Sequence, residues 1–478
     1  MSDSKPLVLD VDGTFLKTDM LLEAFWAGLG RNPWATLRAS LRHFRQPARL
    51  KAELAAIAPL RIDLLPVNPA VADLALNGAA TGREVILASA SDARQVTALA
   101  AQYGLSPRVF ASDGAHNLKA EAKAAALVAA FGERGFDYAG NSTADLPVWA
   151  VAENALVVGR VRGTDALAQQ GQNVVSMPGA EGGWRGALVA MRPHQWVKNI
   201  LLLLPLIAAH RFDLATLVPI LWGIVAFSAA ASSIYIVNDL LDLEADRLHP
   251  KKNRRPFASG AVPIGRGMVT GALLAVLALG VAAALNVGFL AVVIGYMITS
   301  LAYSLKLKRM RWVDIATLAT LYTIRVVAGA AAGQVDVSIY MLIFIFPVFI
   351  ALGCVKRLTE LTLATNDERL PGRGYGRPDR EDLLHVGGLG VCGALVIFFL
   401  YSVSDQGRAL YPDTWLMWLA LIPMAWWLVR MVVLGWFGQQ DYDPIVFAMK
   451  DKLGLGILMI TLSLMFWAAG LWADWFGG

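Results

Sequence analysis

Cysteine is scarce in this chain, which has two cysteines, Cys354 and Cys392, among its 478 residues. Both lie in apolar segments, so the sequence excludes a disulfide framework of the kind that holds small secreted domains together. A secretory signal is also missing, because the N-terminus reads Met1-Ser-Asp-Ser-Lys-Pro and runs directly into a short apolar strand. We therefore expect no cleaved leader.

Charged residues are few as well, at 17% of the chain, whereas 56% of the residues are hydrophobic and the mean hydropathy is +0.51. This composition is too apolar for a single soluble domain and predicts several membrane helices. Residues 1–185 mix charged and apolar residues as a soluble α/β domain does, while long apolar stretches alternate with short polar loops from Ile200 onward. The basic residues are scattered over loops, which gives no support to nucleic-acid binding.

Nine membrane-spanning helices are predicted in the apolar half. Their predicted ranges are 196–211, 214–237, 268–286, 288–304, 313–333, 337–355, 383–402, 413–433 and 454–474. The loops after the second, fourth, sixth and eighth helices carry nearly all the Lys and Arg of this half. By the positive-inside rule these loops and the N-terminal domain face the cytoplasm, and an odd number of spans puts the C-terminus outside. The sequence thus predicts a multi-pass protein of a bacterial-type cytoplasmic (inner) membrane.

An acidic motif, Asn238-Asp239-x-x-Asp242-x-x-x-Asp246, lies between two apolar segments and is followed by a basic run. On a helix the three aspartates share one face, and Asn238 stands beside them. Carboxylates are costly at a membrane boundary, so they indicate a function. Three carboxylates and one amide oxygen on one stripe favour a Mg²⁺ site that also binds substrate phosphates. The alternative is an acidic helix end that balances a positive loop.

The N-terminal part contains three apolar strands that each end in polar residues. One strand, at residues 7–9, leads into Asp10, a second, at residues 85–88, ends at Ser89, and a third, at residues 136–139, runs into Gly140-Asn141-Ser142-Thr143-Ala144-Asp145. Helical stretches separate the strands, which is typical of a doubly wound parallel α/β sheet whose ligands bind at the carboxyl ends of the strands.

A helical insert, or cap, is expected from about residue 20 to residue 70. It contains a run of basic residues at helical spacing, namely Arg38, Arg42, Arg45, Arg49 and Lys51. Such a basic helix either lies on an anionic membrane surface or is an ordinary solvated face.

The motif Asp10-x-Asp12-Gly-Thr in its strand context resembles the haloacid dehalogenase superfamily of phosphatases, and the resemblance covers about residues 5–165. It implies that Asp10 is the nucleophile that forms an aspartyl-phosphate, and that Asp12 is the general acid and base. It also implies that Ser89 holds the phosphoryl group, while Lys123 or Lys119 neutralises its charge.

The same resemblance implies a Mg²⁺ site in the N-terminal domain. Its ligands would come from Asp10, Asp12, Asn141 and Asp145. The family usually has Asp where this chain has Asn141. An amide supplies a carbonyl oxygen but no charge, so this departure is expected to lower the Mg²⁺ affinity of the domain.

The membrane half, from about residue 190 to residue 475, resembles the UbiA superfamily of membrane prenyltransferases, and most closely its decaprenyl-phosphate phosphoribosyltransferase branch. The resemblance is carried by Arg192-Pro-His194-Gln195-Trp196-Val-Lys198-Asn199, by the acidic motif with Arg247 and Arg254-Arg255-Pro256, and by Tyr303-Ser304-x-Lys306 with Asp314 and Arg325. It implies nine helices around a cavity that opens to the lipid, with Mg²⁺ and diphosphate bound at the cytoplasmic side.

The loop after the sixth predicted helix argues for this branch. An aromatic prenyltransferase of this superfamily typically has a second aspartate-rich motif there, whereas this chain has Lys356 and Arg357 with the single acid Glu360. A basic site fits an additional phosphate monoester better than a second Mg²⁺ cluster. Phosphoribosyl diphosphate and a polyprenyl phosphate together present such a set of anions.

Several residues of this half are therefore expected to bind substrate. They are Lys198, Asn199, Arg254, Arg255, Tyr303, Lys306, Lys356 and Arg357. The arginines of the basic run and Lys306 would stabilise the departing diphosphate, and the loop after helix six would hold the prenyl phosphate. Each basic residue could alternatively be a positive-inside anchor, and Tyr303 could simply sit at the interface. Asp314 and Arg325 are expected to form a supporting ion pair.

Together the two resemblances predict a bifunctional membrane enzyme with one Mg²⁺ site in each domain. Residues 1–165 would be the phosphatase-like domain, 166–190 a flexible linker and 191–478 the membrane transferase domain. The first product would be a polyprenyl phosphoryl-ribose that carries a 5-phosphate, which the N-terminal domain would remove. The partners are phosphoribosyl diphosphate, the lipid and the membrane, and a homo-oligomer is compatible with the sequence.

Two alternatives remain open. One is an aromatic prenyltransferase that uses a prenyl diphosphate. The other is a transporter with a soluble regulatory domain, although the sequence contains no repeated halves, which transporters often have.

Overall fold

The chain folds into two compact units in the computed structural model, which describes residues 5–179, 183–336, 338–364, 369, 373–440 and 443–477. One unit combines Met1–Met191 with Tyr235–Ala272, and the other combines Arg192–Ile234 with Leu273–Gly478. We call them the N-terminal unit and the helical unit.

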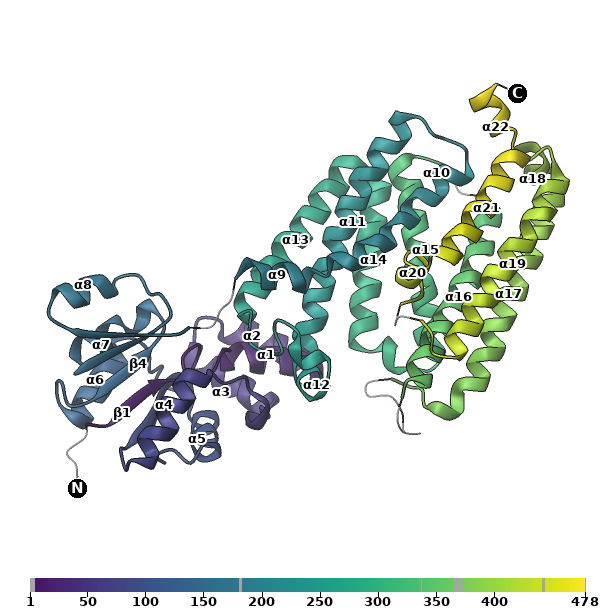
Figure 1. Cartoon of the computed structure of the whole chain (residues 1–478). Coiled ribbons are helices and arrows are strands. Elements are labelled where there is room, and N and C mark those ends of the chain that lie inside the picture. Colours follow the sequence, from purple (N-terminus) through teal and green to yellow (C-terminus); the bar gives the residue numbers. More distant parts are fainter. Residues whose placement is uncertain are drawn as a thin grey trace. The chain divides into compact units, whose positions relative to one another are not determined.

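A six-stranded parallel sheet is the centre of the N-terminal unit (Figure 1). The strands are β1 (Leu7–Asp10), β2 (Val85–Asp92), β3 (Val109–Ser112), β4 (Asp137–Gly140), β5 (Asn154–Val158) and β6 (Asn173–Met177). Their order is β3-β2-β1-β4-β5-β6, so the chain leaves β1 toward β2 on one side and reaches β4 on the other. The carboxyl end of β1 is therefore the topological switch point, where ligands of such sheets bind.

The doubly wound fold predicted for this part is present, with helices on both faces of the sheet. Leu7 and Leu9 pack against apolar residues of α4 and α5, whereas Val8 between them packs with residues of α6 and α7. This alternation follows from the two-residue period of a strand. The helices of the unit are α1 (Met20–Arg31), α2 (Pro33–His43), α3 (Pro47–Ile57), α4 (Pro69–Ala80), α5 (Ala93–Gln102), α6 (Glu121–Phe131), α7 (Leu146–Val151), α8 (Thr164–Gln169), α9 (Trp184–Met191) and α12 (Leu243–Leu248).

Two features of this unit differ from the sequence-based expectation. Strand β6 lies inside the range 166–190 that was expected to be a linker, and it pairs in parallel with β5. The segment 235–272, which contains the acidic motif, clusters with the N-terminal unit although the sequence assigned it to the membrane domain. The expected helical insert after β1 is present as α1, α2 and α3.

A buried ion pair joins the acidic segment to the N-terminal sheet domain. Arg247 on α12 donates from Nη2 to Glu23 Oε1 at 2.5 Å and from Nη1 to Glu23 Oε2 at 3.1 Å. Thr18 donates to the same Oε1 at 2.7 Å, and Arg247 Nε donates to the carbonyl of Ala258 at 3.0 Å. The side chains of Arg247 and Glu23 are 8% and 3% exposed.

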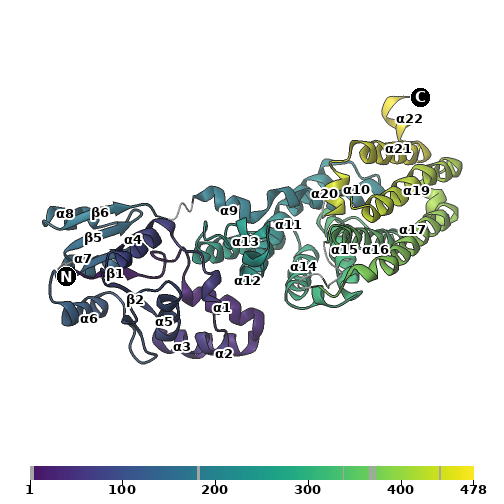
Figure 2. The same cartoon turned by 60° about the horizontal axis from the view of Figure 1, so that its bottom comes forward.

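The long apolar helices make the chain a multi-pass membrane protein. Among the described residues, seven helical segments are long and apolar enough to cross a membrane: α11 (Leu214–Leu241), α13 (Ile264–Leu285), α14 (Val287–Leu305), α15 (Val313–Gly333), α16 (Ile339–Thr362), Arg377–Val403, which contains α17 (Arg380–Val403), and α19 (Thr414–Trp436). Both views show α15, α16 and α17 side by side (Figures 1 and 2). The shorter helices are α10 (Leu204–Ala208), α18 (Asp405–Leu410), α20 (Pro444–Ala448), α21 (Lys452–Ala468) and α22 (Leu471–Phe476).

The first and last of the nine predicted spans take other forms. The range 196–211 is covered mainly by the 3-10 helix η3 (Pro193–Leu203) and by α10. The range 454–474 is covered by α21, which has 17 residues, and by part of α22. The count of nine spans therefore stays a prediction.

The ion pair between Glu23 and Arg247 is predicted to hold the acidic segment in place. Glu23→Ala should destabilise the N-terminal unit by about 3–5 kcal/mol, because it leaves the buried guanidinium without its charge partner. The change would be measured as a lower melting temperature and as faster proteolysis of segment 235–272 in the detergent-solubilised protein.

Arg31→Ala is the matched control, because Arg31 also joins α1 to α12, through an ion pair with Glu244 at 3.0 Å. The side chains of Arg31 and Glu244 are both more than 40% exposed. Loss of this ion pair should therefore lower the free energy of unfolding by only roughly 0–1 kcal/mol. Equal effects of the two substitutions would contradict the role given to Glu23.

Candidate active sites in the two units

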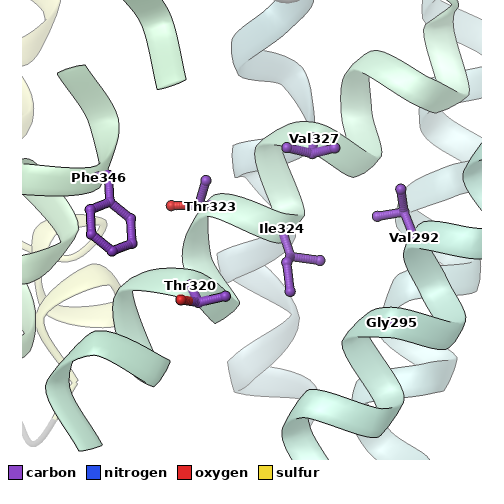
Figure 3. Close-up of a pocket in the computed structure, with 7 residues that line it drawn as sticks. All are labelled: Val292, Gly295, Thr320, Thr323, Ile324, Val327 and Phe346. Carbon is purple, nitrogen blue, oxygen red and sulfur yellow. The ribbon is translucent and has the colours of Figure 1, made fainter. Parts of the chain in front are cut away.

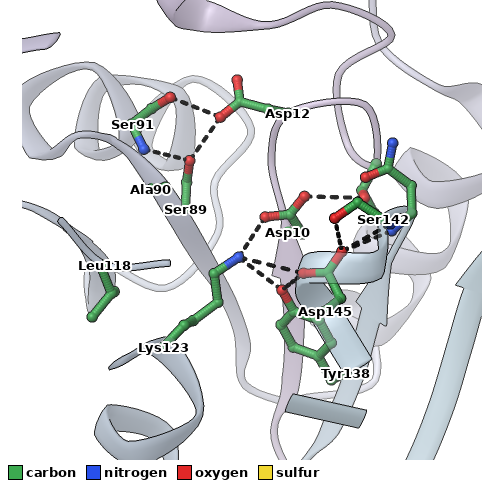
Figure 4. Close-up of polar contacts among 12 residues, drawn as sticks. Asp10, Asp12, Ser89, Ala90, Ser91, Leu118, Lys123, Tyr138, Ser142 and Asp145 are labelled. Atoms are coloured by element: carbon green, nitrogen blue, oxygen red, sulfur yellow. Dashed lines mark hydrogen bonds and ion pairs between the residues drawn. The ribbon is translucent and has the colours of Figure 1, made fainter. Parts of the chain in front are cut away.

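A cluster of buried charges lies at the carboxyl end of β1 (Figure 4). Lys123 on α6 donates to Asp10 Oδ1 at 2.7 Å and to the Tyr138 hydroxyl at 2.9 Å, and its Nζ is 3.7 Å from Asp145 Oδ1. Burial is the main reason that the pKa of Asp10 is raised to about 7, although the nearby Lys123 opposes the shift. Lys123 thus takes the position expected for the charge-neutralising lysine, whereas Lys119 is exposed.

Asp12 faces two serines of strand β2. Ser89 and Ser91 donate to Asp12 Oδ2 at 2.9 and 2.7 Å, and the backbone N–H of Met20 donates to Asp12 Oδ1 at 2.8 Å. Ser89 was predicted to belong to the site, but Ser91 was missed. Ser91 could have been predicted from the two-residue period of a strand, because residues 89 and 91 point to the same side of the sheet. The predicted strand ended at Ser89, whereas β2 continues to Asp92.

The loop after β4 is organised around Asp145. Asp145 Oδ2 accepts hydrogen bonds from the backbone N–H groups of Asn141 and Ser142 and from the Ser142 hydroxyl, at 2.9–3.1 Å. Its Oδ1 accepts from Tyr138 at 2.8 Å. Gly13 has φ +79°, and a Cβ there would lie 2.2 Å from the side-chain amide of Asn141, so glycine is required where the two loops meet.

The acidic motif brings two of its carboxylates onto one guanidinium. Helix α11 ends at Leu241 and α12 begins at Leu243, so Asp242 is a turn residue between them. Arg255 Nη1 donates to Asp239 Oδ1 at 3.0 Å and to Asp246 Oδ2 at 2.7 Å. Both aspartates are buried, at 2% and 3% exposure. Burial raises the pKa of Asp246 to about 6, against the effect of Arg255.

The donor set of this segment suits Mg²⁺ in chemical type. Mg²⁺ usually takes one or two carboxylates and completes its shell with water and substrate phosphates, and Asp239 and Asp246 are two carboxylates that converge on one cationic nitrogen. In the described part of the chain, no group of three or more His, Cys, Asp or Glu side chains is arranged to hold a metal. Arg254, expected to act with Arg255, is exposed.

In the helical unit, Asp443 pairs with two lysines from different elements. Lys198 on η3 forms an ion pair with Asp443, and Lys356 Nζ on α16 is 3.9 Å from Asp443 Oδ2. Tyr322 donates to the same oxygen at 3.4 Å. Burial disfavours the charged carboxylate, but the two lysines outweigh it and lower the pKa of Asp443 to about 2.

Sequence reasoning found both lysines but missed Asp443. The sequence around Asp443 indicates only a helix cap, because Asp443 precedes Pro444 at the start of α20. Its side chain accepts a hydrogen bond from the backbone N–H of Val446 at 3.3 Å. An N-cap aspartate before proline normally has only this local role. Its contact with the lysines depends on long-range packing.

Arg357 is a buried residue that contacts side chains on three helices. It is 0% exposed, and it donates from Nε and Nη2 to the two carboxylate oxygens of Asp314 at 2.5 and 2.9 Å. It also donates to the Tyr303 hydroxyl at 2.9 Å and pairs with Glu360. Arg373 lies between α16 and α17 and donates to Tyr303 at 3.0 Å, so it joins the network formed by α14, α15 and α16.

The predicted ion pair between Asp314 and Arg325 is wrong, because in the described structure Asp314 is engaged by Arg357, Arg373 and Tyr303. Arg325 donates to Asn199 Oδ1 at 3.2 Å and to Tyr296 at 3.1 Å.

Asn199 and Lys306 were also expected to bind substrate, but one is buried in a hydrogen-bond network and the other is exposed. Asn199 is 1% exposed and donates to Ser228 at 2.8 Å, in addition to accepting from Arg325. It therefore links η3 to α11. Lys306 follows the end of α14 and is exposed.

A large apolar cavity of about 860 Å³ lies in the helical unit. Its wall includes Ile200, Leu352, Phe398, Tyr401, Ile445 and Met465. Ile200 follows Lys198 by two residues, Ile445 follows Asp443 by two, and Leu352 precedes Lys356 by one helical turn. Three of the lining residues thus lie close in sequence to the two lysines and Asp443, while others come from α17 and α21.

A second, smaller cavity of about 220 Å³ lies among α14, α15 and α16 (Figure 3). Its polar side chains are Thr320 and Thr323, whose hydroxyls donate to the carbonyls of Ala316 and Ala319 one turn earlier in α15. Because these donors are already used within the helix, this cavity offers mainly apolar contacts.

Comparison with known proteins extends these observations. An uncharacterized protein of Sinorhizobium fredii (strain NBRC 101917 / NGR234), y4nM, is 31% identical over 468 residues, which cover 96% of this chain and 90% of that protein. Decaprenyl-phosphate phosphoribosyltransferase of Mycobacterium tuberculosis (strain ATCC 25618 / H37Rv) is 30% identical over 273 residues, 56% of this chain and 89% of that enzyme. The solved structure of a UbiA homolog from Archaeoglobus fulgidus bound to GPP and Mg²⁺ has a TM-score of 0.44 at 15% identity, and the match covers 60% of this chain and 99% of that chain.

The sequence also matches the UbiA prenyltransferase family over residues 200–450. This match covers more than half of the chain and contains the acidic motif, Lys356 and Asp443. The chain therefore belongs to the UbiA prenyltransferase family.

Proposed function

We propose that this chain transfers 5-phosphoribose from phosphoribosyl diphosphate to a polyprenyl phosphate, for example decaprenyl phosphate, in the membrane. The observation that carries the proposal is an apolar cavity with wall residues two to four positions from Lys198, Lys356 and Asp443 in sequence, together with the ion pairs that bring these three residues together. A polyprenyl phosphate has the same two parts, because a long apolar chain ends in a phosphate monoester. The relatives named decaprenyl-phosphate phosphoribosyltransferase support the same substrate class.

The two lysines would bind the phosphate of the lipid. They face one carboxylate, so an arriving phosphate competes with Asp443 for two ammonium donors and forms charge-assisted hydrogen bonds with them. Asp443 would hold the lysines in position before the lipid binds. Arg357, expected to bind the phosphate directly, would instead support Lys356 from its buried network on the same helix.

The acidic segment would handle the diphosphate. Asp239 and Asp246 would hold Mg²⁺, with Asn238 and Asp242 as further ligands, and the bound ion would offset the charge of the leaving diphosphate. The guanidinium of Arg255 would then exchange the two carboxylates for diphosphate oxygens, which it can bind in a bidentate manner.

The proposed transfer is a single displacement at the ribose. A phosphate oxygen of the lipid forms a bond to the anomeric carbon, while the bond from this carbon to the diphosphate breaks. The diphosphate leaves with the electron pair, and basic side chains stabilise its charge. The product is a polyprenyl phosphoryl-ribose that still carries the 5-phosphate.

We further propose that the N-terminal unit removes this 5-phosphate, as a phosphatase of the haloacid dehalogenase type. Asp10 would attack the phosphorus, and Asp12 would protonate the leaving ribose oxygen and later activate water. The proposal is supported by Lys123 beside Asp10 and by Ser89 beside Asp12. A Mg²⁺ held by Asp10, Asp12, Asn141 and Asp145 would offset the charge of the phosphoryl group.

The transfer is tested by incubating the purified protein with Mg²⁺, polyprenyl phosphate and phosphoribosyl diphosphate labelled in its ribose. We expect the label to move into the lipid fraction. A parallel incubation supplies a prenyl diphosphate and a phenolic acceptor in place of these two substrates. Label that stays in the aqueous phase of the first incubation would contradict the proposal, and consumption of both substrates in the second would favour aromatic prenylation.

Lys356→Met is expected to raise the KM for polyprenyl phosphate by roughly tenfold or more, because a hydrogen bond to a charged group is worth about 1.5–3 kcal/mol. The KM for phosphoribosyl diphosphate should change little. Steady-state kinetics with each substrate varied in turn would measure both values, and exposed Arg408 gives the control Arg408→Met. A selective rise in the KM for phosphoribosyl diphosphate would overturn the assignment.

Asp246→Asn is expected to lower kcat for transfer by roughly 100-fold or more, since it removes a charged ligand from the proposed metal site. The Mg²⁺ concentration for half-maximal activity should rise in the same titration. Glu244 lies on the same helix with a side chain 45% exposed, so Glu244→Gln is the control. A Mg²⁺ titration unchanged by Asp246→Asn would contradict the metal site.

Asp10→Asn is expected to abolish removal of the 5-phosphate while transfer continues, because only the nucleophile of the second step is lost. The phosphorylated ribosyl lipid should accumulate, as measured by mass spectrometry of the lipid extract. Asp113→Asn changes an exposed carboxylate of the same unit and serves as the control. Normal dephosphorylated product from Asp10→Asn would exclude the phosphatase role.

A further inference from the structure

Helix α2 presents an unusual exposed surface. Its large apolar side chains point outward: Trp34 is 78% exposed, Leu41 77% and Phe44, which follows the helix, 67%. Leu37 between them is 43% exposed. These positions recur at intervals of three and four residues, so they form one stripe along the helix. Large apolar side chains that gather on one exposed stripe indicate a binding surface.

A basic stripe runs beside the apolar one. Arg38, Arg42 and Arg45 are exposed, and at 100° per residue they lie on one flank of the apolar stripe, between it and the buried side. The buried side is formed by Thr36, Ala39 and His43. The helix therefore has three distinct faces, of which one packs against its own unit.

The sequence that flanks α2 on both sides contains no acidic residues. From residue 24 to residue 52 the chain contains no Asp or Glu, but it has six Arg or Lys residues. The basic stripe is therefore complementary to an anionic surface. The adjacent apolar stripe, which includes a tryptophan, is typical of helices that lie in the interface of a bilayer.

The position of α1 places this surface near the ends of two membrane-spanning helices. A Cβ on Gly30 would lie 3.8 Å from the carbonyl oxygen of Leu241, the last residue of α11. Arg31 pairs with Glu244 just beyond that end, and a Cβ on Gly265, in the first turn of α13, would lie 3.6 Å from Leu22. These residues belong to the N-terminal unit. Helix α2 follows at once, because Asn32 caps both α1 and α2.

We propose that α2 is an interfacial helix that binds the anionic lipid surface of the membrane that the chain spans, with Trp34, Leu37, Leu41 and Phe44 inserted at the headgroup level. The arginines of the basic stripe bind lipid phosphates beside them. None of these residues belongs to the candidate active sites described above. It attaches the N-terminal unit to the bilayer independently of the spans.

The test uses the full-length protein in lipid nanodiscs with an environment-sensitive fluorophore on a single cysteine at position 41. Cys392 is replaced by serine, and Cys354 is buried. Leu41→Cys is compared with Leu76→Cys, whose parent leucine is 45% exposed on α4 of the same unit. Quenching by a spin-labelled lipid is measured with and without phosphatidylglycerol in a phosphatidylcholine bilayer. Thermal melting of each labelled protein confirms that it is folded.

We expect the lipid to quench the probe at position 41 at least twofold more than the probe at position 76. The difference should shrink in the neutral bilayer and at high salt, because salt screens the attraction between arginine and phosphate. Arg38→Glu with Arg42→Glu should also remove it. Arg108, an exposed arginine beyond the insert, gives the control Arg108→Glu.

Three results would overturn the proposal. Equal quenching at positions 41 and 76 would show that α2 does not contact lipid. Quenching at position 41 that does not respond to phosphatidylglycerol, salt or the arginine substitutions would exclude recognition of anionic lipid. Protection of position 41 from an aqueous quencher in detergent, rising with protein concentration, would show that a second copy of the chain covers the helix instead.

Discussion

An ionised side chain can be buried only beside an opposite charge, and this constraint underlies each candidate site of the chain. Asp10 is buried against Lys123, and Asp443 is buried against Lys198 and Lys356. In each case the partner of the carboxylate is a lysine that a phosphate can also engage. The lysines that stabilise the buried carboxylates in the free protein are therefore the groups that an anionic substrate would bind.

The acidic segment shows how the same constraint joins parts that are distant in sequence. Its Arg247 is buried against Glu23 of α1, and its Asp246 is buried against Arg255. Segment 235–272 consequently folds with the N-terminal unit, although it connects two membrane-spanning helices. A relative that aligns with 96% of this chain, and so with both parts, is consistent with the two parts having been retained together.

Much of the fold could be predicted because its signals are local. The strand that ends at Asp10 is a short apolar run, and seven of the predicted spans correspond to long apolar helices in the described residues. What the sequence did not reveal depends on packing between distant segments. Asp443 reads as a simple helix cap, the partner of Asp314 proved to be Arg357 rather than Arg325, and β6 is a mostly exposed edge strand with a weak apolar pattern.

The most direct test of this account is to locate the lipid within the helical unit by photo-crosslinking. A polyprenyl phosphate with a photoreactive group next to the phosphate should label residues beside Lys198, Lys356 or Asp443, as mapped by peptide mass spectrometry. The same lipid with the group far along the chain should label the wall of the 860 Å³ cavity, for example Phe398 or Tyr401. Labelling by the phosphate-proximal group that avoids the lysine cluster, with or without labelling of the cavity, would contradict the assignment of this site to a lipid phosphate.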